Sequence, residues 1–251
     1  MHLKDPGRIK VFIKDPNKKN YLRIIKEVIV LWITKKELPM YYFKHLYKKE
    51  IKNYREYLGR AEIARIHKSK KLHKPEYTSI LRNKLNFSLY CERNAIKTPR
   101  LISHNFGSTF FSSNISREIS NLRELVNFYK NVFESNPVEA IFFRPLALNG
   151  GSGCFKLARD SFSQQLEKEY ENLMDGDFTH TETIQQHHRI NEMYSKSINT
   201  LRILTHFDKG NVGIISSLMR VGVGGNIVDN ASSGGLFVGI DQKSGTLKRK
   251  A

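Results

Sequence analysis

The chain has 251 residues, and 42 lysines and arginines against 24 acidic residues give it a formal net charge of +18. A hydrophobic fraction of 39% can fill a core, which excludes a chain that is disordered throughout. Two cysteines cannot build a disulfide framework or a zinc knuckle. The most apolar run, residues 28–33, is too short to span a bilayer, and residues 1–10 lack a secretory pattern, so we expect a cytoplasmic protein.

The positive charge is concentrated in the first third of the chain. Residues 1–75 hold 21 basic and 7 acidic residues, a net charge of +14 from 21 − 7, which leaves +4 for the rest. Apolar residues recur there at helical spacing, with lysines and arginines between them, and this predicts helices over residues 21–32 and 40–58. The basic run at 68–71 and Pro75 are typical of a linker.

This basic helical region admits three interpretations. Its charge beside an amphipathic face suits a docking surface for anionic membrane lipid at the inner face of the membrane, or for a lipid-phosphate carrier. Nucleic acid is a weaker alternative, because no zinc-finger spacing, aromatic RNA-binding pattern or clear helix-turn-helix accompanies the charge. The third interpretation is a solvated basic face on helices that cap the main domain.

Beyond residue 75 the pattern predicts a mixed α/β protein (α+β) without the regular βαβ alternation of a Rossmann sheet. Helices are expected at residues 76–94, 119–133 and 163–173. A polar loop is expected at 107–116. Strands are expected at residues 100–103, 140–143, 154–157, 181–186, 201–207, 212–221 and 234–240.

A glycine-rich loop joins the strands expected at 140–143 and 154–157. Its small residues would let backbone N–H groups converge on a phosphate, and they are Gly150, Gly151, Ser152 and Gly153. The loop has no Walker A lysine and joins strand to strand, so by itself it equally fits a tight hairpin turn. Two cations could reach a phosphate there: Arg144, just before the loop, and Lys84, on an earlier helix.

The order of these features is that of the ATP-grasp nucleotide site: strand, cation–proline pair, glycine loop, strand and, after a helix, Thr-Glu-Thr-Ile at 181–184. Asn-Thr-Leu-Arg at 199–202 and Val-Asp-Asn, followed by Gly-Gly, at 228–235 make the match more specific. From about residue 77 onward the chain resembles the sugar-transfer associated ATP-grasp proteins. That branch is related to α-L-glutamate ligases and is found with capsule and exopolysaccharide genes.

The resemblance implies an ATP-grasp fold behind an N-terminal basic helical extension. The extension would occupy residues 1–75, and the ATP-grasp N-terminal part would occupy residues 76–137. The glycine loop would lie in a flap subdomain at 138–185. Residues 186–251 would form an incomplete C-terminal subdomain.

The resemblance also implies a role for each matching residue. Lys84 and Arg144 would contact the phosphates of ATP, Arg144 standing where the family usually has lysine. Residues 150–153 would be the flap over the β- and γ-phosphates. The interlobe hinge, whose backbone would bind adenine, would comprise Glu182, Thr183, Ile184 and Gln185. The catalytic group would comprise Arg202, Arg220 and Asn230, with the two arginines stabilising the transferring phosphoryl group.

The implied activity is that of an ATP-dependent carboxylate–amine ligase, or a related ligase, acting in capsule or exopolysaccharide biosynthesis. A carboxylate is a poor electrophile, so ATP first converts it to an acyl-phosphate, from which an amine or other nucleophile displaces phosphate. The protein mainly positions and neutralises anions in such a reaction. The implied partners are ATP and a carboxylate-bearing small molecule or sugar precursor.

The expected Mg²⁺ cofactor has no ligands assigned in this sequence. In the family, an acid and a Glu-x-Asn motif hold Mg²⁺ on the phosphates, whereas Asp241 is the sole acid after Gly235 here. We therefore expect a truncated chain whose metal ligands belong to a missing C-terminal segment, and which is inactive by itself. The alternative is a non-catalytic basic module that binds anionic membrane lipid or polymer.

Overall fold

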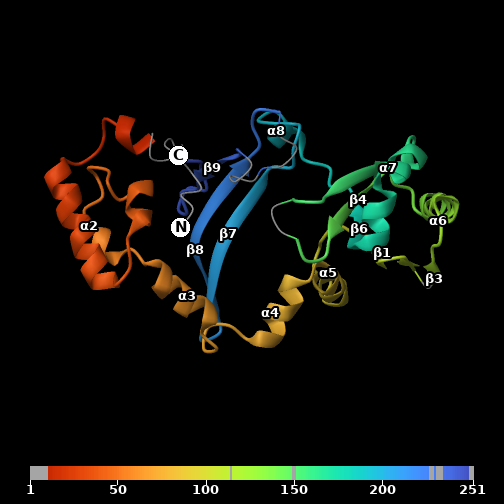
Figure 1. The fold of residues 1–251 in the computed structure, drawn as a ribbon, viewed down its shortest axis with the longest axis horizontal. Helices are drawn as coiled ribbons and strands as arrows, with labels where there is room; N and C mark the ends of the chain where they lie inside the picture. The colour runs from red at the N-terminus through yellow and green to blue at the C-terminus, as the bar shows by residue number, and fades with distance from the viewer. Residues whose placement is uncertain (1–10, 114, 149–150, 226–228, 230–233, 249–251) are drawn as a thin grey trace. The chain divides into compact units, whose positions relative to one another are not determined.

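The computed structural model describes residues 11–113, 115–148, 151–225, 229 and 234–248. The chain divides into two compact units, Met1–Thr78 and Ser79–Ala251 (Figure 1). Within the described residues, no helix combines the length and the apolar character needed to cross a bilayer. The domain boundaries expected at residues 75, 137 and 185 stay predictions.

Helix α2, Tyr21–Lys35, is the main element of the first unit, and it confirms the helix expected at 21–32. It begins at Asn20, whose side chain accepts a hydrogen bond from the N–H of Arg23 at 2.8 Å. It ends where Lys36 turns into the left-handed region with φ of 53°. The inner face of α2 contributes to a small core that consists of Ile24, Leu31, Tyr42, Leu46 and Tyr47.

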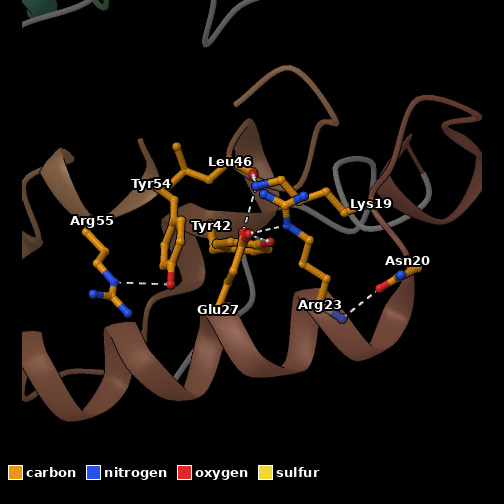
Figure 2. A network of polar contacts seen from close by, with 8 residues as sticks. All are labelled: Lys19, Asn20, Arg23, Glu27, Tyr42, Leu46, Tyr54 and Arg55. Atoms are coloured by element: carbon orange, nitrogen blue, oxygen red, sulfur yellow. Dashed lines mark hydrogen bonds and ion pairs between the residues drawn. The ribbon is translucent and has the colours of Figure 1, made fainter. Parts of the chain in front are cut away.

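A buried cluster of charges lies beside this core (Figure 2). The carboxylate of Glu27 accepts hydrogen bonds from Lys19 Nζ at 2.6 Å, from the Tyr42 hydroxyl at 2.7 Å and from Arg23 Nε at 2.8 Å. Lys19 also donates to the carbonyl of Leu46 at 2.8 Å. Burial by itself raises the pKa of Glu27, but the three donors outweigh it and leave this pKa below its usual value.

The continuous helix expected at 40–58 is wrong. The structure has two short 3-10 helices there, Met40–Lys44 and Tyr54–Glu56, with turns between them. The aromatic residues that suggested a helix pack onto α2 instead, because Tyr42 and Tyr47 are both buried in the small core. Apolar residues at helical spacing can thus pack into a core without forming a helix.

Helix α3, Arg60–Lys68, completes the described helices of the first unit, and the sequence pattern did not predict it. Its first turn is tied to the end of α2, since Lys35 forms an ion pair with Glu62 at 2.9 Å. Glu37 accepts a hydrogen bond from the N–H of Arg60 at 2.6 Å, which satisfies one free donor of the helix start. Residues 69–74 then lead to helix α4, Pro75–Arg82.

Six antiparallel strands form the main sheet of the second unit, in the order β3-β2-β1-β6-β4-β5. The strands are β1 Leu101–Phe106, β2 Thr109–Ser112, β3 Ile115–Glu118, β4 Ala140–Pro145, β5 Phe155–Ala158 and β6 Asp177–Glu182. The helices of this unit after α4 are α5 Lys84–Arg93, α6 Leu122–Ser135, α7 Phe162–Asp175 and the single turn α8 His188–Asn191.

Helices α6 and α7 build the core of the second unit against the main sheet. Phe128 and Tyr129 of α6 and Leu166 of α7 are buried in one cluster with Phe110 and Phe143 of the sheet. Successive side chains of a strand point to opposite faces. The face of β4 that carries Phe143 is therefore the helix-covered face, and its neighbouring residues face the other way.

A second, three-stranded antiparallel sheet follows in the order β7-β8-β9. Its strands are β7 Thr200–Asp208, β8 Asn211–Val221 and β9 Leu236–Gly239, which confirms the paired strands expected at 201–207 and 212–221. The antiparallel sheets and the helices confirm the expected mixed α/β class, and this architecture is consistent with an ATP-grasp fold.

Two further expectations are corrected. The polar loop expected at 107–116 contains strands β2 and β3, because Phe110 of β2 is buried in the core while β3 lies exposed at the sheet edge. The strand expected at 181–186 lies earlier in the chain. It pairs with β1 from Asp177 onward and with β4 as far as Glu182, where it ends. The start of β6 was missed because polar residues such as Thr179 and His180 are buried inside the sheet and give no apolar signal.

Candidate functional site

Arg144 lies on strand β4 just before the glycine loop and points away from the helix-covered face. It pairs across the sheet with Thr179 of β6, and it follows the core residue Phe143. Its Nε is buried without a hydrogen-bond partner in the described part of the chain. Burial lowers the pKa of Arg144. A buried guanidinium atom with no partner is a candidate anion contact.

Lys84 reaches the same end of β4 from helix α5. Asn83 caps this helix by accepting hydrogen bonds from the N–H groups of Leu85 and Asn86 at 2.9 and 3.0 Å, which makes Lys84 the first helical residue. Its Nζ donates to three carbonyls at and just after the end of β4, those of Pro145 at 2.6 Å, Leu146 at 3.4 Å and Leu148 at 2.5 Å. The structure thus brings Lys84 to the start of the glycine loop.

The two cations and Cys154 influence one another electrostatically. Burial lowers the pKa of Lys84, Cys154 opposes this shift, and the nearby charge of Arg144 adds to it. Burial raises the pKa of the Cys154 thiol, although both cations oppose this shift. A lowered ammonium pKa marks a site where added negative charge would be favourable. The cluster of Lys84, Arg144 and Cys154 therefore suits an anion better than another cation.

The described part of the loop has the backbone geometry that only glycine adopts easily. Gly151 has φ of 80°, and Gly153 has φ of 70°. A Cβ at Gly153 would also lie 2.9 Å from the ring of Pro145, so a side chain there would be both strained and crowded. Ser152 between them is exposed. Gly150 lies outside the described residues.

The hinge residues predicted for adenine follow strand β6. The N–H of Glu182 donates to the carbonyl of Arg100 at 3.0 Å, and its carboxylate accepts from the N–H of Arg100 at 3.0 Å. Both groups of Glu182 are therefore already bonded. Thr183, half-buried, and the exposed Ile184 and Gln185 come directly after it. Their predicted role at adenine stays a prediction.

Arg202 and Arg220 share one face of the three-stranded sheet. Arg202 pairs with Leu218, and Arg220 follows two residues later on β8, opposite Thr200. Diagonal neighbours on one face are close enough for long side chains to meet. Arg202 is exposed and has no polar partner among the residues that the structure describes. Asn230, the third predicted catalytic residue, lies outside them.

Arg220 differs from Arg202 because it is buried against Asp229. Its guanidinium forms an ion pair with the carboxylate of Asp229 at 2.9 Å, and its Nε donates to the carbonyl of Asp229 at 3.3 Å. The Thr200 hydroxyl donates to the same carboxylate. The sequence motif includes Asp229, but the motif does not predict this ion pair. The buried charge of Arg220 is thus balanced within the sheet.

Two other residues that sequence reasoning missed organise the connector before β7. Gln186 accepts from the N–H of Asn199 at 2.6 Å and donates to the side chain of Asn191 at 2.8 Å. Asn199 accepts from the N–H of Gly222 at 3.1 Å and donates to the carbonyl of Tyr194 at 2.8 Å. Asn199 is the first residue of the Asn-Thr-Leu-Arg motif, so this position of the motif has a structural role: it holds the connector in place.

The acids of the C-terminal region do not fit a preformed magnesium site. The described residues contain no group of three or more metal-ligating side chains. Asp229 is held by Arg220 and Thr200, and Asp241 accepts from the N–H groups of Lys243 and Ser244 at 3.0 and 2.9 Å. Two acids that are each bonded in this way do not form the octahedral oxygen site that Mg²⁺ requires.

Comparison with known proteins gives one family match for part of the chain. Residues 163–251 match the protein family described as sugar-transfer associated ATP-grasp. The predicted family is confirmed over this part of the chain. Comparison with curated proteins and with solved structures found no significant match. The match spans α7, β6 and the three-stranded sheet with both of its arginines.

The ATP-grasp match begins after residue 162, so it leaves out part of the predicted site. Lys84, Arg144 and the glycine loop precede it. Their roles toward ATP stay predictions, supported by their meeting at one place. The match shows the likeness of residues 163–251 to the sugar-transfer associated ATP-grasp family.

Proposed function

We propose that this ATP-grasp protein binds the phosphates of ATP at Lys84, Arg144 and the glycine loop, and that it uses ATP to activate a carboxylate in sugar-polymer assembly. One observation carries the proposal: two cations from separate elements, α5 and β4, meet at the start of a loop whose backbone is shaped by glycine. No acid pairs with either cation in the described part of the chain.

In this proposal the two cations have different tasks. Arg144 would contact a phosphate directly, because its buried Nε has no hydrogen-bond partner among the described residues. Lys84 already uses its three donors on backbone carbonyls, so it would position the loop and add charge at close range. Ser152 and the adjacent backbone N–H groups would cover the phosphates.

The chemistry proposed for the second sheet follows from the two arginines. A carboxylate oxygen of the substrate would attack the γ-phosphorus, and ADP would leave. An amine or a related nucleophile would then attack the acyl carbon of the acyl-phosphate and displace inorganic phosphate. The exposed guanidinium of Arg202 would neutralise charge on the transferring group, while Arg220, paired with Asp229, would act as a positioning residue.

Binding of a fluorescent ATP analogue tests the proposal. Arg144→Met keeps the length of the side chain and removes its charge. We expect it to weaken binding by about tenfold or more, because a hydrogen bond to a charged group contributes about 1.5–3 kcal/mol. Arg144→Lys should retain most of the affinity. Lys156→Met, a change at an exposed lysine of nearby β5, is the matched control and should bind as the wild type does.

Equal affinity in Arg144→Met and the wild type would refute the phosphate site. ADP release with added carboxylates, measured on the same proteins, separates the ligase from a non-catalytic module: ATP binding without ADP release would favour the module. The predicted contact of residues 1–75 with anionic lipid, the cytoplasmic location and the link to capsule or exopolysaccharide synthesis stay predictions.

A further inference from the structure

Helix α2 exposes a second apolar face, opposite the one that it packs into the core. Leu22 is 82% exposed, Ile33 is 70% exposed and Ile25 is 55% exposed. Side chains at three- and four-residue spacing lie on one side of a helix, since each residue turns the helix by about 100°. We call this face the α2 stripe, and it consists of Tyr21, Leu22, Ile25, Ile29, Trp32 and Ile33.

The α2 stripe is unusual for a surface helix. The outer face of such a helix normally carries charged and polar residues. Large contiguous apolar patches on a protein surface mark interaction sites. The one acid of α2, Glu27, is buried under Lys19, Arg23 and Tyr42, so it places no negative charge on the stripe (Figure 2).

The charge around the α2 stripe indicates what it binds. Lys26, exposed on α2, lies beside the stripe in the helical order, the exposed Lys36 directly follows the helix, and residues 1–75 carry a net charge of +14. Apolar side chains with a tryptophan, flanked by lysines, match the pattern of helices that lie in the interface of an anionic bilayer. Nucleic acid would satisfy the lysines but would leave the six apolar side chains in water.

The helix is also held rigidly enough to present this face. Asn20 caps its start, the Glu27 cluster fixes its middle, and the Lys35–Glu62 ion pair fixes its end. A surface that is ordered before binding does not lose conformational entropy when it docks. We propose that the α2 stripe docks the protein onto an anionic lipid bilayer, with Trp32 and its apolar neighbours entering the interface. This inference does not depend on the proposed ATP site.

Vesicle binding by the full chain tests this inference. The wild type should sediment with vesicles that contain phosphatidylglycerol and bind phosphatidylcholine vesicles more weakly. Ile25→Ser with Ile29→Ser should weaken partitioning by about tenfold or more, because buried apolar area sets the strength of such binding. The matched control is Ile203→Ser with Ile215→Ser in the second sheet, where Ile203 is 54% exposed, and it should bind as the wild type does.

The single tryptophan of the chain, Trp32, adds an internal signal. Its emission should shift to the blue on anionic vesicles, and lipids brominated near the headgroup should quench it. Lys26→Gln with Lys36→Gln should reduce the preference for anionic vesicles. Leu22→Ser repeats the test at the most exposed position of the stripe, where a change in folding is not expected.

Three outcomes would overturn the inference. The stripe variants could bind vesicles as tightly as the wild type, or Trp32 emission could stay unchanged on sedimented protein. Sedimentation velocity could instead show a wild-type dimer, broken by Leu22→Ser, with no vesicle binding. The last result would assign the α2 stripe to a second copy of the chain.

Discussion

At the scale of single residues, the second unit depends on a buried polar network centred on His180. Its Nδ1 lies 2.7 Å from the Ser103 hydroxyl and 3.1 Å from that of Tyr129, and its Nε2 lies 3.0 Å from Asn105 Oδ1. The amide nitrogen of Asn105 donates to three backbone carbonyls, so its oxygen must accept from Nε2. Burial holds the pKa of His180 well below its usual range, and the ring is neutral.

This network predicts acid-sensitive folding of the second unit. In the unfolded chain His180 binds a proton near pH 6.5, whereas in the folded state it stays neutral at that pH. The free energy of unfolding is therefore at its highest above pH 6.5 and falls as the pH is lowered below it. The slope contributed by His180 should approach about 1.4 kcal/mol per pH unit. His180→Gln should flatten the slope of unfolding free energy between pH 6.5 and 5, as measured by urea denaturation.

The exposed residue His45 provides the matched control for this prediction. His45→Gln should retain the wild-type slope. Burial also lowers the pKa of His104, so His104 should account for the pH dependence that remains in His180→Gln. An unchanged slope in His180→Gln would contradict the assignment. The absolute stability of this variant will fall for packing reasons, so the slope is the informative quantity.

At the scale of elements, two helix starts of the second unit have asparagine caps with different consequences. Asn83 begins α5 and thereby places Lys84 beside the glycine loop. Asn121 begins α6 by accepting from the N–H of Glu124 at 3.0 Å, on a helix that only packs against the sheet. The same local motif therefore serves the candidate site in one helix and the core in the other.

The two caps predict a separation of stability from binding. Asn83→Ala and Asn121→Ala should each lower the free energy of unfolding by about 1 kcal/mol, because each frees a backbone donor. Asn83→Ala should in addition weaken binding of the ATP analogue several-fold, whereas Asn121→Ala should leave it unchanged. Asn83→Ser should restore both quantities. Equal affinities in the two alanine variants would show that the start of α5 does not position the site.

At the scale of the whole molecule, the two units have separate cores. The core of the first unit contains Leu31, Tyr42 and Tyr47, and that of the second contains Tyr129 and Phe143, and the two clusters share no residue. The Glu27 cluster belongs wholly to the first unit. Damage to one core should consequently leave the other intact.

Glu27→Gln tests the independence of the units. It leaves the buried ammonium of Lys19 without a carboxylate, and breaking such a buried pair costs about 3–5 kcal/mol. Hydrogen exchange measured by mass spectrometry should rise in α2 and in residues 42–46, while β4 and β6 keep wild-type protection. Glu56→Gln, at an exposed acid of the same unit, should change neither. Faster exchange in β4 and β6 would show that the two units unfold together.

Much of the fold was predictable wherever local pattern and tertiary packing agree. Helices α2 and α6 and strands β7 and β8 follow from apolar spacing, since their buried faces are apolar. The apolar pattern wrongly predicts one continuous helix at residues 40–58, where aromatic side chains pack onto α2 from short 3-10 helices and turns. It also missed β2, β3 and the start of β6, whose polar residues pair inside or at the edge of the sheet.

The sequence by itself determined the charge of the first unit, the mixed α/β class and a family that the comparison confirmed over residues 163–251, because composition, periodicity and motif order are local properties. Only the tertiary structure decided which charges are neutralised. It buries Glu27 under Lys19, pairs Arg220 with Asp229 and, within the part of the chain that the structure describes, gives Arg144 no acidic partner. These outcomes depend on distances between residues far apart in the chain, and the energy of a buried charge is set by its nearest partner.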